Sequence, residues 1–276
     1  MTVSKLILGT ANFLNPYGLY QKDVNNIQND LKKIINLSLI NNITAIDTAV
    51  HYGTISDIIE LQKNFRIFKI INKIKPNERE LFELNLKYTD TLLLHIDPRQ
   101  KHNTQFLIKL LANAKKRKSK MNIGVSIYGE NDIETEVYDF CDVVQLPVSV
   151  LDKTLLESGF IERLRSKSIK IHSRSIFLQG VLLNDPNKLK NNVANLYPAI
   201  SKFHAYCREK NYSPLQVCLN FVLSNCLIDF SVCGFNSYAE LEQLIRLEKQ
   251  QYLNLSDMPH FEVQDIAMLK PYNWLK

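Results

Sequence analysis

The feature that most constrains the fold is a repeated pairing of a short apolar run with a longer segment of helical spacing. Eight such runs occur along the 276 residues, each bounded by polar residues. They lie at 5–9, 43–47, 66–73, 91–95, 121–126, 142–146, 169–175 and 229–234. Apolar runs that alternate with helical segments are typical of parallel strands buried on both faces.

The segments between the runs predict helices at 24–41, 55–64, 77–87, 103–117, 131–138, 151–166, 196–225 and 237–248. We expect the seventh to break at Ser213-Pro214, because proline cannot continue a helix from its interior. Eight strand–helix units predict an α/β fold, namely a (β/α)8 TIM barrel, more than a doubly wound sheet. No GxGxxG motif follows any run, which weakens the Rossmann alternative further.

The rest of the chain offers no second domain. No Pro/Gly/Ser-rich linker interrupts it, so residues 1–276 are expected to form a single domain. The segment after 249 predicts one short helix near 263–269 and then an exposed end, PYNWLK.

Composition disfavours several classes of protein. The five cysteines form no CxxC pair, which argues against a disulfide framework and a zinc site. The net charge of +6 is largely matched by a basic cluster at 114–120, which lacks interleaved aromatics and fits a helix C-terminus better than a nucleic-acid surface. Neither a signal peptide nor an apolar run of membrane-spanning length is present. We therefore predict a cytoplasmic protein without metal, nucleic-acid or membrane partner, and leave its oligomeric state open.

If the chain is a barrel, its chemistry belongs at the carboxyl ends of the strands. Asp47 ends the second run, Tyr52 follows five residues later, and Lys73 and His95 end the third and fourth runs. An ammonium near a phenol favours the phenolate and so lowers the phenol pKa from about 10. The four residues therefore suit protonation of a carbonyl oxygen by Tyr52, with Asp47 as the counterion of Lys73 and His95 as a hydrogen-bonding group for the carbonyl.

In order and at intervals of one barrel unit, the motifs of this chain resemble those of the aldo-keto reductase family. The motifs are LILGTANF, AIDTAVHYG, IINKI, LLLH, IGVS, VVQLPVSVLD, SRSIFLQGVLL and SVCGFNSYAEL, between residues 6 and about 247. The resemblance implies that Tyr52 is the general acid and that Lys73 lowers its pKa. It also implies that Asp47 pairs with Lys73 and that His95 orients the carbonyl of the substrate.

The same resemblance implies hydride transfer from NADPH, or alternatively NADH, to a small-molecule carbonyl compound. The cofactor-binding positions that it implies are Thr10, Ser126, Gln145, Arg174, Ser175, Gly234, Asn236 and Ser237. Ser126 and Gln145 correspond to positions that hold the carboxamide. Residues 234–237 correspond to the loop and helix N-terminus that bind phosphate, where free amides attract anions.

Several positions depart from the family pattern. Ile127 stands where the family often has Asn, and Arg174 stands where many members offer an aromatic face to the nicotinamide. No cation follows Gly234 closely to bind the 2′-phosphate of NADPH, Arg246 being the nearest. A short loop after His95 and a short tail predict an open, polar pocket that suits a sugar or another polar carbonyl compound.

Two alternatives belong to other classes. A barrel that binds cofactor but has lost turnover would act as a sensor or a partner-binding protein, and a Tyr52→Phe variant of it would behave like the wild type. A metal-dependent hydrolase would use Asp47, His51, His95 and Asp97, but it would leave Lys73 without a role.

Overall fold

The computed structural model describes residues 3–19, 25–53, 55–78, 87–189 and 191–274. Eight parallel strands form a closed barrel in which each strand pairs with the next and β8 pairs with β1. They are β1 (Leu6–Gly9), β2 (Ala45–Ala49), β3 (Lys69–Ile74), β4 (Thr91–His95), β5 (Asn122–Ser126), β6 (Val143–Pro147), β7 (Lys170–Arg174) and β8 (Phe230–Gly234). The predicted (β/α)8 barrel is confirmed.

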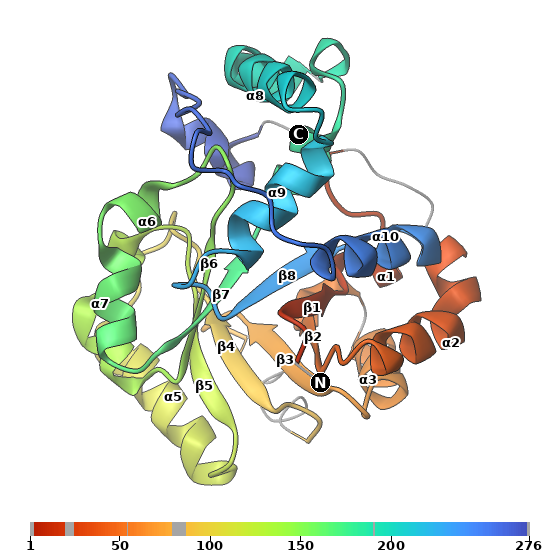
Figure 1. Ribbon diagram of the computed structural model, residues 1–276. Helices are drawn as coiled ribbons and strands as arrows, with labels where there is room; N and C mark the ends of the chain where they lie inside the picture. Colours follow the sequence, from red (N-terminus) through yellow and green to blue (C-terminus); the bar gives the residue numbers. More distant parts are fainter. Residues whose placement is uncertain (1–2, 20–24, 54, 79–86, 190, 275–276) are drawn as a thin grey trace.

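Helices surround the barrel (Figure 1). The α-helices are α1 (Ala11–Leu14), α2 (Asn25–Ile40), α3 (Ile55–Asn64), α5 (Thr104–Arg117), α6 (Thr154–Glu157), α7 (Phe160–Ser166), α8 (Tyr197–Glu209), α9 (Pro214–Leu223) and α10 (Tyr238–Glu248). Side-chain caps fix where several of them begin. Asn103 accepts from the Phe106 amide at 2.8 Å before α5, and Ser237 accepts from the Glu240 amide at 3.2 Å before α10.

Short 3₁₀ helices occupy most of the connecting loops. They are η1 (Val50–Tyr52), η2 (Glu130–Asp132), η3 (Thr135–Phe140), η4 (Leu178–Leu183), η5 (Pro186–Lys188), η6 (Asn191–Leu196), η7 (Ile266–Leu269) and η8 (Pro271–Asn273).

The predicted helices differ from the observed ones in identifiable places. The segment 196–225 does break before Pro214, as expected. The segment 131–138 is wrong as an α-helix, since it forms η2 and η3. The segment 151–166 divides at Gly159, whose φ of +69° is a left-handed conformation that glycine adopts without strain. Most of the helix predicted at 77–87 falls outside the described residues.

The second strand has the predicted length but lies two residues further along the chain, at 45–49 instead of 43–47, and this changes the position of Asp47. The strand continues to Ala49, so Asp47 is its middle residue and does not lie at its end. On the neighbouring strand, Ala49 is level with Lys73. Because residues two apart in a strand face the same side, Asp47, Ala49 and Lys73 all face the barrel interior. The strand geometry thus directs the carboxylate and the ammonium toward each other.

The prediction of an exposed C-terminal end is wrong for Trp274, while residues 275–276 lie outside the described residues. Trp274 is only 6% exposed, and its indole N–H donates to the Met268 carbonyl at 2.8 Å. Its ring joins a second apolar cluster, separate from the main barrel core, which includes Phe203 of α8, Val217 of α9 and Phe261. Figure 1 shows α8 and the C-terminal segment at the same end of the molecule.

Candidate active site

The centre of the site is a buried group of one carboxylate, one ammonium and one amide. The Lys73 ammonium makes a close ion pair with Asp47 Oδ1. Gln145 Nε2 donates to Asp47 Oδ2 at 2.7 Å, and Lys73 Nζ lies 3.5 Å from Gln145 Oε1. None of the three residues is more than 4% exposed. Each partner therefore satisfies a charge or polar group that would otherwise be costly to bury.

A second row of polar side chains comes from three adjacent strands. His95, Ser126 and Gln145 are level with one another across β4, β5 and β6. His95 Nδ1 lies 3.4 Å from Ser126 Oγ, which donates to Gln145 Oε1 at 3.5 Å. Burial, followed by the charge of Arg174, lowers the pKa of His95 to about 2. Its imidazole is therefore neutral at physiological pH and can donate one N–H to an oxygen atom.

Tyr52 lies at the end of η1, directly after β2. The Lys73 ammonium is 5.4 Å from the centroid of its ring, and the His51 ring centroid is 5.3 Å away. The Asn15 amide donates to the Tyr52 carbonyl at 2.7 Å and so fixes the loop. A Cβ on Gly53 would lie 2.8 Å from Leu14 Cδ1, so the Leu14 side chain would have to shift to accommodate a larger residue.

The expectation of a lowered Tyr52 pKa is wrong for this structure. Burial raises the pKa of Tyr52 strongly, and the Asp47 carboxylate raises it further, while Arg174 acts in the opposite direction. The close pairing of Lys73 with Asp47 explains the difference, since the ammonium charge is largely balanced by that carboxylate. The phenol is therefore protonated at physiological pH and is available as a proton donor.

Arg174 forms the opposite wall of the site. Its guanidinium donates to the Ile127 carbonyl at 2.8 Å and to Ser175 Oγ at 3.1 Å. One face of the guanidinium stacks on Tyr128, with Cζ 4.2 Å from the ring centroid. Its buried Nε has no hydrogen-bond partner among the described residues. Arg174 is thus held in one orientation by its neighbours.

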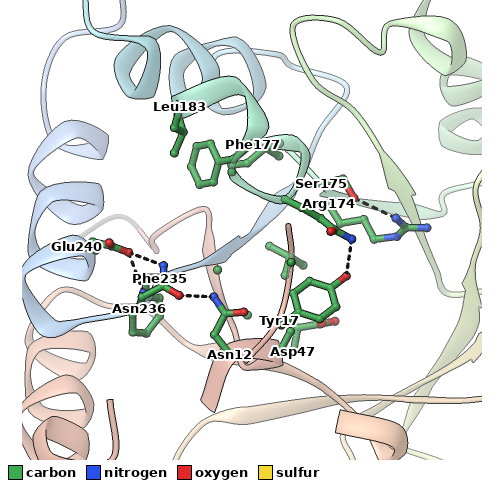
Figure 2. Close-up of a pocket in the computed structure, with 18 of the residues that line it drawn as sticks. Asn12, Tyr17, Asp47, Arg174, Ser175, Phe177, Leu183, Phe235, Asn236 and Glu240 are labelled. Carbon is green, nitrogen blue, oxygen red and sulfur yellow. Dashed lines mark hydrogen bonds between the residues drawn. The ribbon is translucent and has the colours of Figure 1, made fainter. Parts of the chain in front are cut away.

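A cavity of about 840 Å³ connects these groups with the start of α10 (Figure 2). Ten of the twelve predicted site residues line it: Asp47, Tyr52, Lys73, His95, Ser126, Gln145, Arg174, Ser175, Gly234 and Asn236. Thr10 and Ser237 do not. The Thr10 hydroxyl donates to the Asp47 carbonyl at 3.0 Å, and the Ser237 hydroxyl caps α10. Both hydroxyls thus stabilise segments next to the cavity without forming part of its wall.

The far end of the cavity is a polar loop at the start of α10. The Asn12 amide donates to Asn236 Oδ1 at 2.8 Å, and the Asn236 backbone amide donates to the Glu240 carboxylate at 2.8 Å. Figure 2 shows this network on the side of the cavity away from Arg174. Arg246 lies in the last turn of α10 and is not part of the cavity wall. It is therefore wrongly placed to bind a phosphate at the start of that helix.

Aromatic residues of the cavity that sequence reasoning missed include Tyr17 and Tyr128. Tyr17 lies with its ring centroid 6.3 Å from that of Tyr52, and its hydroxyl accepts from Gln179 at 3.4 Å. Tyr128 lies between Arg174 and Tyr272. The available signal was position, because each lies in the segment that follows a predicted strand. Aromatic residues in loops are too frequent for position alone to single them out.

The metal-dependent alternative lacks a ligand set. Within the described ranges, no three His, Cys, Asp or Glu side chains come together in a way that could hold a metal ion. The described residues likewise include no helix that is both long and apolar enough to span a membrane.

Comparison with known proteins gives concordant results. A model of the Aldo/keto reductase family matches residues 69–263. Among solved structures, PA4992 of Pseudomonas aeruginosa, which carries the name of an aldo-keto reductase, aligns with a TM-score of 0.62 at 17% identity over 90% of each chain. The glycerol dehydrogenase AKR11B4 of Gluconobacter oxydans aligns with a TM-score of 0.63 at 14% identity, over 92% of this chain and 89% of its own. Comparison with curated protein sequences gives no match.

Proposed function

Since the chain belongs to the aldo/keto reductase family, we propose that it reduces an aldehyde or ketone to an alcohol with a nicotinamide cofactor. The observation that carries this proposal is the meeting of Tyr52, His95 and the buried Lys73–Asp47 pair at one end of a large cavity. A proton donor, a neutral hydrogen-bond donor and a nearby ammonium group suit the stabilisation of a developing alkoxide.

Each residue has a separate task in this proposal. Tyr52 gives its phenolic proton to the carbonyl oxygen as negative charge develops there. The neutral imidazole of His95 donates a hydrogen bond to the same oxygen and orients it. Lys73 stabilises the phenolate that remains, and Asp47 with Gln145 holds the ammonium in place. The carbonyl carbon gains a hydride and its oxygen gains a proton, so the product is an alcohol.

The cavity also suits the cofactor. When bound, NAD(P)H supplies the hydride. A cavity of about 840 Å³ is within the range of cofactor sites. Its wall includes both the catalytic residues and the start of α10. Ser126 and Gln145 would hold the carboxamide, and Arg174, with its unpartnered Nε, would face the nicotinamide. Gly234, Asn236 and the N-terminus of α10 would bind phosphate.

The choice between NADPH and NADH depends on a cation near the 2′ position. The basic residues of the described cavity wall are Lys73 and Arg174, and both lie at the catalytic end. We therefore expect NADPH and NADH to bind with similar affinity, within about tenfold, since the 2′-phosphate gains no additional charged contact. Titration of the protein with each cofactor, followed by tryptophan and tyrosine fluorescence, measures the ratio.

Replacement of Tyr52 tests the proposal. We expect Tyr52→Phe to lower kcat for carbonyl reduction by about 10²–10⁴-fold, which is the usual contribution of a general acid. Cofactor affinity should change little. Tyr17→Phe is the matched control, because it removes a second phenol from the same cavity at a ring distance of 6.3 Å. Oxidation of NAD(P)H with a panel of aldoses, keto sugars and aromatic aldehydes provides the rates.

Three results would count against parts of this proposal. Failure to bind either cofactor would overturn it. Cofactor binding with a Tyr52→Phe variant equal to the wild type in every assay would favour the sensor alternative. A larger loss of kcat for Tyr17→Phe than for Tyr52→Phe would show that Tyr52 is not the general acid.

A further inference from the structure

A second, smaller cavity lies beside the catalytic end of the large one. Its volume is about 260 Å³, and its wall comes from the loops after β3 and β4 and from the start of α5. We call it the side cavity. His95 belongs to the walls of both cavities. A water molecule takes up about 30 Å³ in the liquid, so the side cavity has room for a group of several heavy atoms.

The side cavity carries an excess of positive charge. Lys75 and Lys101 line it, and neither ammonium has a hydrogen-bond or ion-pair partner in the described part of the chain. The carboxylate of its described wall belongs to Asp97. That carboxylate accepts two hydrogen bonds of 2.9 Å from the Arg99 guanidinium, which lowers the pKa of Asp97 to about 2. Arg99 thus balances Asp97, and among the residues that the structure describes neither lysine has a counterion.

The charge of Lys75 also acts on the catalytic end of the large cavity. Burial, followed by the charge of Lys75, lowers the pKa of His51 to about 4. Lys75 contributes to the lowered pKa of His95 as well. Lys75 and His95 line the same cavity, which agrees with this effect of the ammonium. The first turn of the 14-residue helix α5 contributes Phe106 to the side cavity, and a helix N-terminus adds further attraction for an anion.

We propose that the side cavity binds an anionic group of the substrate, so that the enzyme reduces phosphorylated or carboxylated carbonyl compounds. This inference rests on the proposed function, because it concerns the same active site. The substrate carbonyl contacts His95 from the large cavity, and its anionic group reaches Lys75 and Lys101 past the same imidazole. Phosphate and carboxylate share the chemistry that two ammonium groups recognise, and a matched set of substrates separates them.

Turnover of matched aldehydes tests the proposal. D-glyceraldehyde 3-phosphate is compared with D-glyceraldehyde, and succinic semialdehyde with butyraldehyde, in assays with both NADPH and NADH. We expect kcat/KM to be at least tenfold higher for the charged member of one pair or both, mainly through KM. The pair with the larger ratio identifies phosphate or carboxylate as the preferred group.

Charge-removing variants locate the effect. Lys75→Gln and Lys101→Gln should each lower the charged-to-neutral ratio of kcat/KM at least threefold, and the double variant should bring it close to 1. Lys75→Arg keeps the charge and should preserve most of the ratio. Lys69→Gln is the matched control, because Lys69 begins β3, the strand that ends just before Lys75, is 74% exposed in its side chain and lies outside both cavity walls. It should leave the ratio unchanged.

Calorimetry measures the binding of inorganic phosphate and succinate to the wild type and to the double variant. This measurement separates failure of this inference from failure of the proposed function. Binding that the double variant loses, without turnover of any aldehyde, would support the side cavity and overturn the reductase function. Turnover with a charged-to-neutral ratio near 1 would support the function and overturn the side cavity. Absence of both binding and turnover would overturn both.

Discussion

Asp47 has two hydrogen-bond partners that sequence reasoning assigned to different tasks. The sequence predicts Lys73 beside it, whereas the family resemblance implies that Gln145, with Ser126, holds the carboxamide of the cofactor. In the structure Gln145 donates to the second carboxylate oxygen at 2.7 Å and also lines the cavity. Its amide thus completes the environment of a buried charge. Because β2 and β6 are not neighbours in the barrel, no sequence spacing could have revealed this contact.

The Asp47–Lys73 pair makes a prediction about stability. We expect Asp47→Asn to lower the free energy of unfolding by about 3–5 kcal/mol, because it leaves a buried ammonium without a counterion. The double variant Asp47→Asn/Lys73→Met removes that ammonium and should be more stable than Asp47→Asn alone. Urea unfolding followed by circular dichroism measures both. Additive losses in the double variant would show that the two charges do not stabilise each other.

Buried histidines make a prediction about pH. Burial, the largest cause in each case, lowers the pKa of His95 to about 2 and that of His172 to about 4. In the unfolded chain a histidine titrates near 6.5, so below that pH the unfolded state binds more protons. Stability is therefore lost as the pH falls below about 6.5. For each of these histidines the free energy of unfolding should fall by up to about 1.4 kcal/mol per pH unit.

Denaturant titrations between pH 7 and pH 4.5 check this. His172→Gln removes the contribution of one histidine, so the free energy of unfolding should depend less steeply on pH. His260→Gln is the control, because its side chain is 63% exposed and is not part of the buried core. An equal effect of the two substitutions would contradict the assignment.

At the scale of the element, the strands show how well apolar patterning predicts secondary structure. All eight runs became strands, within three residues of the expected bounds, because each is long enough to be buried on both faces. The helices were predicted less well where the apolar pattern was short. Residues 131–138 carry too few apolar positions to pack a full α-helix, and they form 3₁₀ turns.

One glycine determines how β5 packs against β6. A Cβ on Gly124 would lie 1.7 Å from the Val143 carbonyl oxygen, a backbone atom that cannot move aside without breaking the pairing. We expect Gly124→Ala to lower the free energy of unfolding by about 3 kcal/mol or more. Gly129→Ala is the control, because its nearest neighbour would be the Asp132 carboxylate at 3.4 Å, and it should cost less than about 1 kcal/mol. Similar losses for both variants would argue against the close strand contact.

At the scale of the whole molecule, the C-terminal tail is part of the active-site end of the barrel. Lys270 donates to the Tyr128 carbonyl at 2.9 Å and to Asp152 at 3.1 Å. Tyr272 packs edge-on against Tyr128, with ring centroids 4.8 Å apart. Since Tyr128 stacks on Arg174, the tail supports the orientation of that guanidinium. The open end expected from a short tail is thus partly covered.

Trp274 anchors this tail and makes a prediction about the whole fold. We expect Trp274→Ala to lower the free energy of unfolding by about 3–5 kcal/mol, which is usual for loss of a large buried aromatic. Tyr252→Ala is the control, because Tyr252 is 42% exposed and should change stability by no more than about 0.5 kcal/mol. Thermal unfolding followed by circular dichroism gives both values. If Trp274→Ala unfolds at the same midpoint temperature as the wild type, the tail does not unfold cooperatively with the rest of the protein.

The sequence by itself determined the barrel, its strand order and the strand ends that carry Tyr52, Lys73 and His95, because these follow from apolar periodicity and local spacing. Only the tertiary structure decided how Gln145 reaches Asp47, how Tyr128 and the tail support Arg174, and how burial raises the pKa of Tyr52. These depend on contacts between elements far apart in the chain and on the solvent that those contacts exclude. Local sequence patterns predict neither these contacts nor the exclusion of solvent.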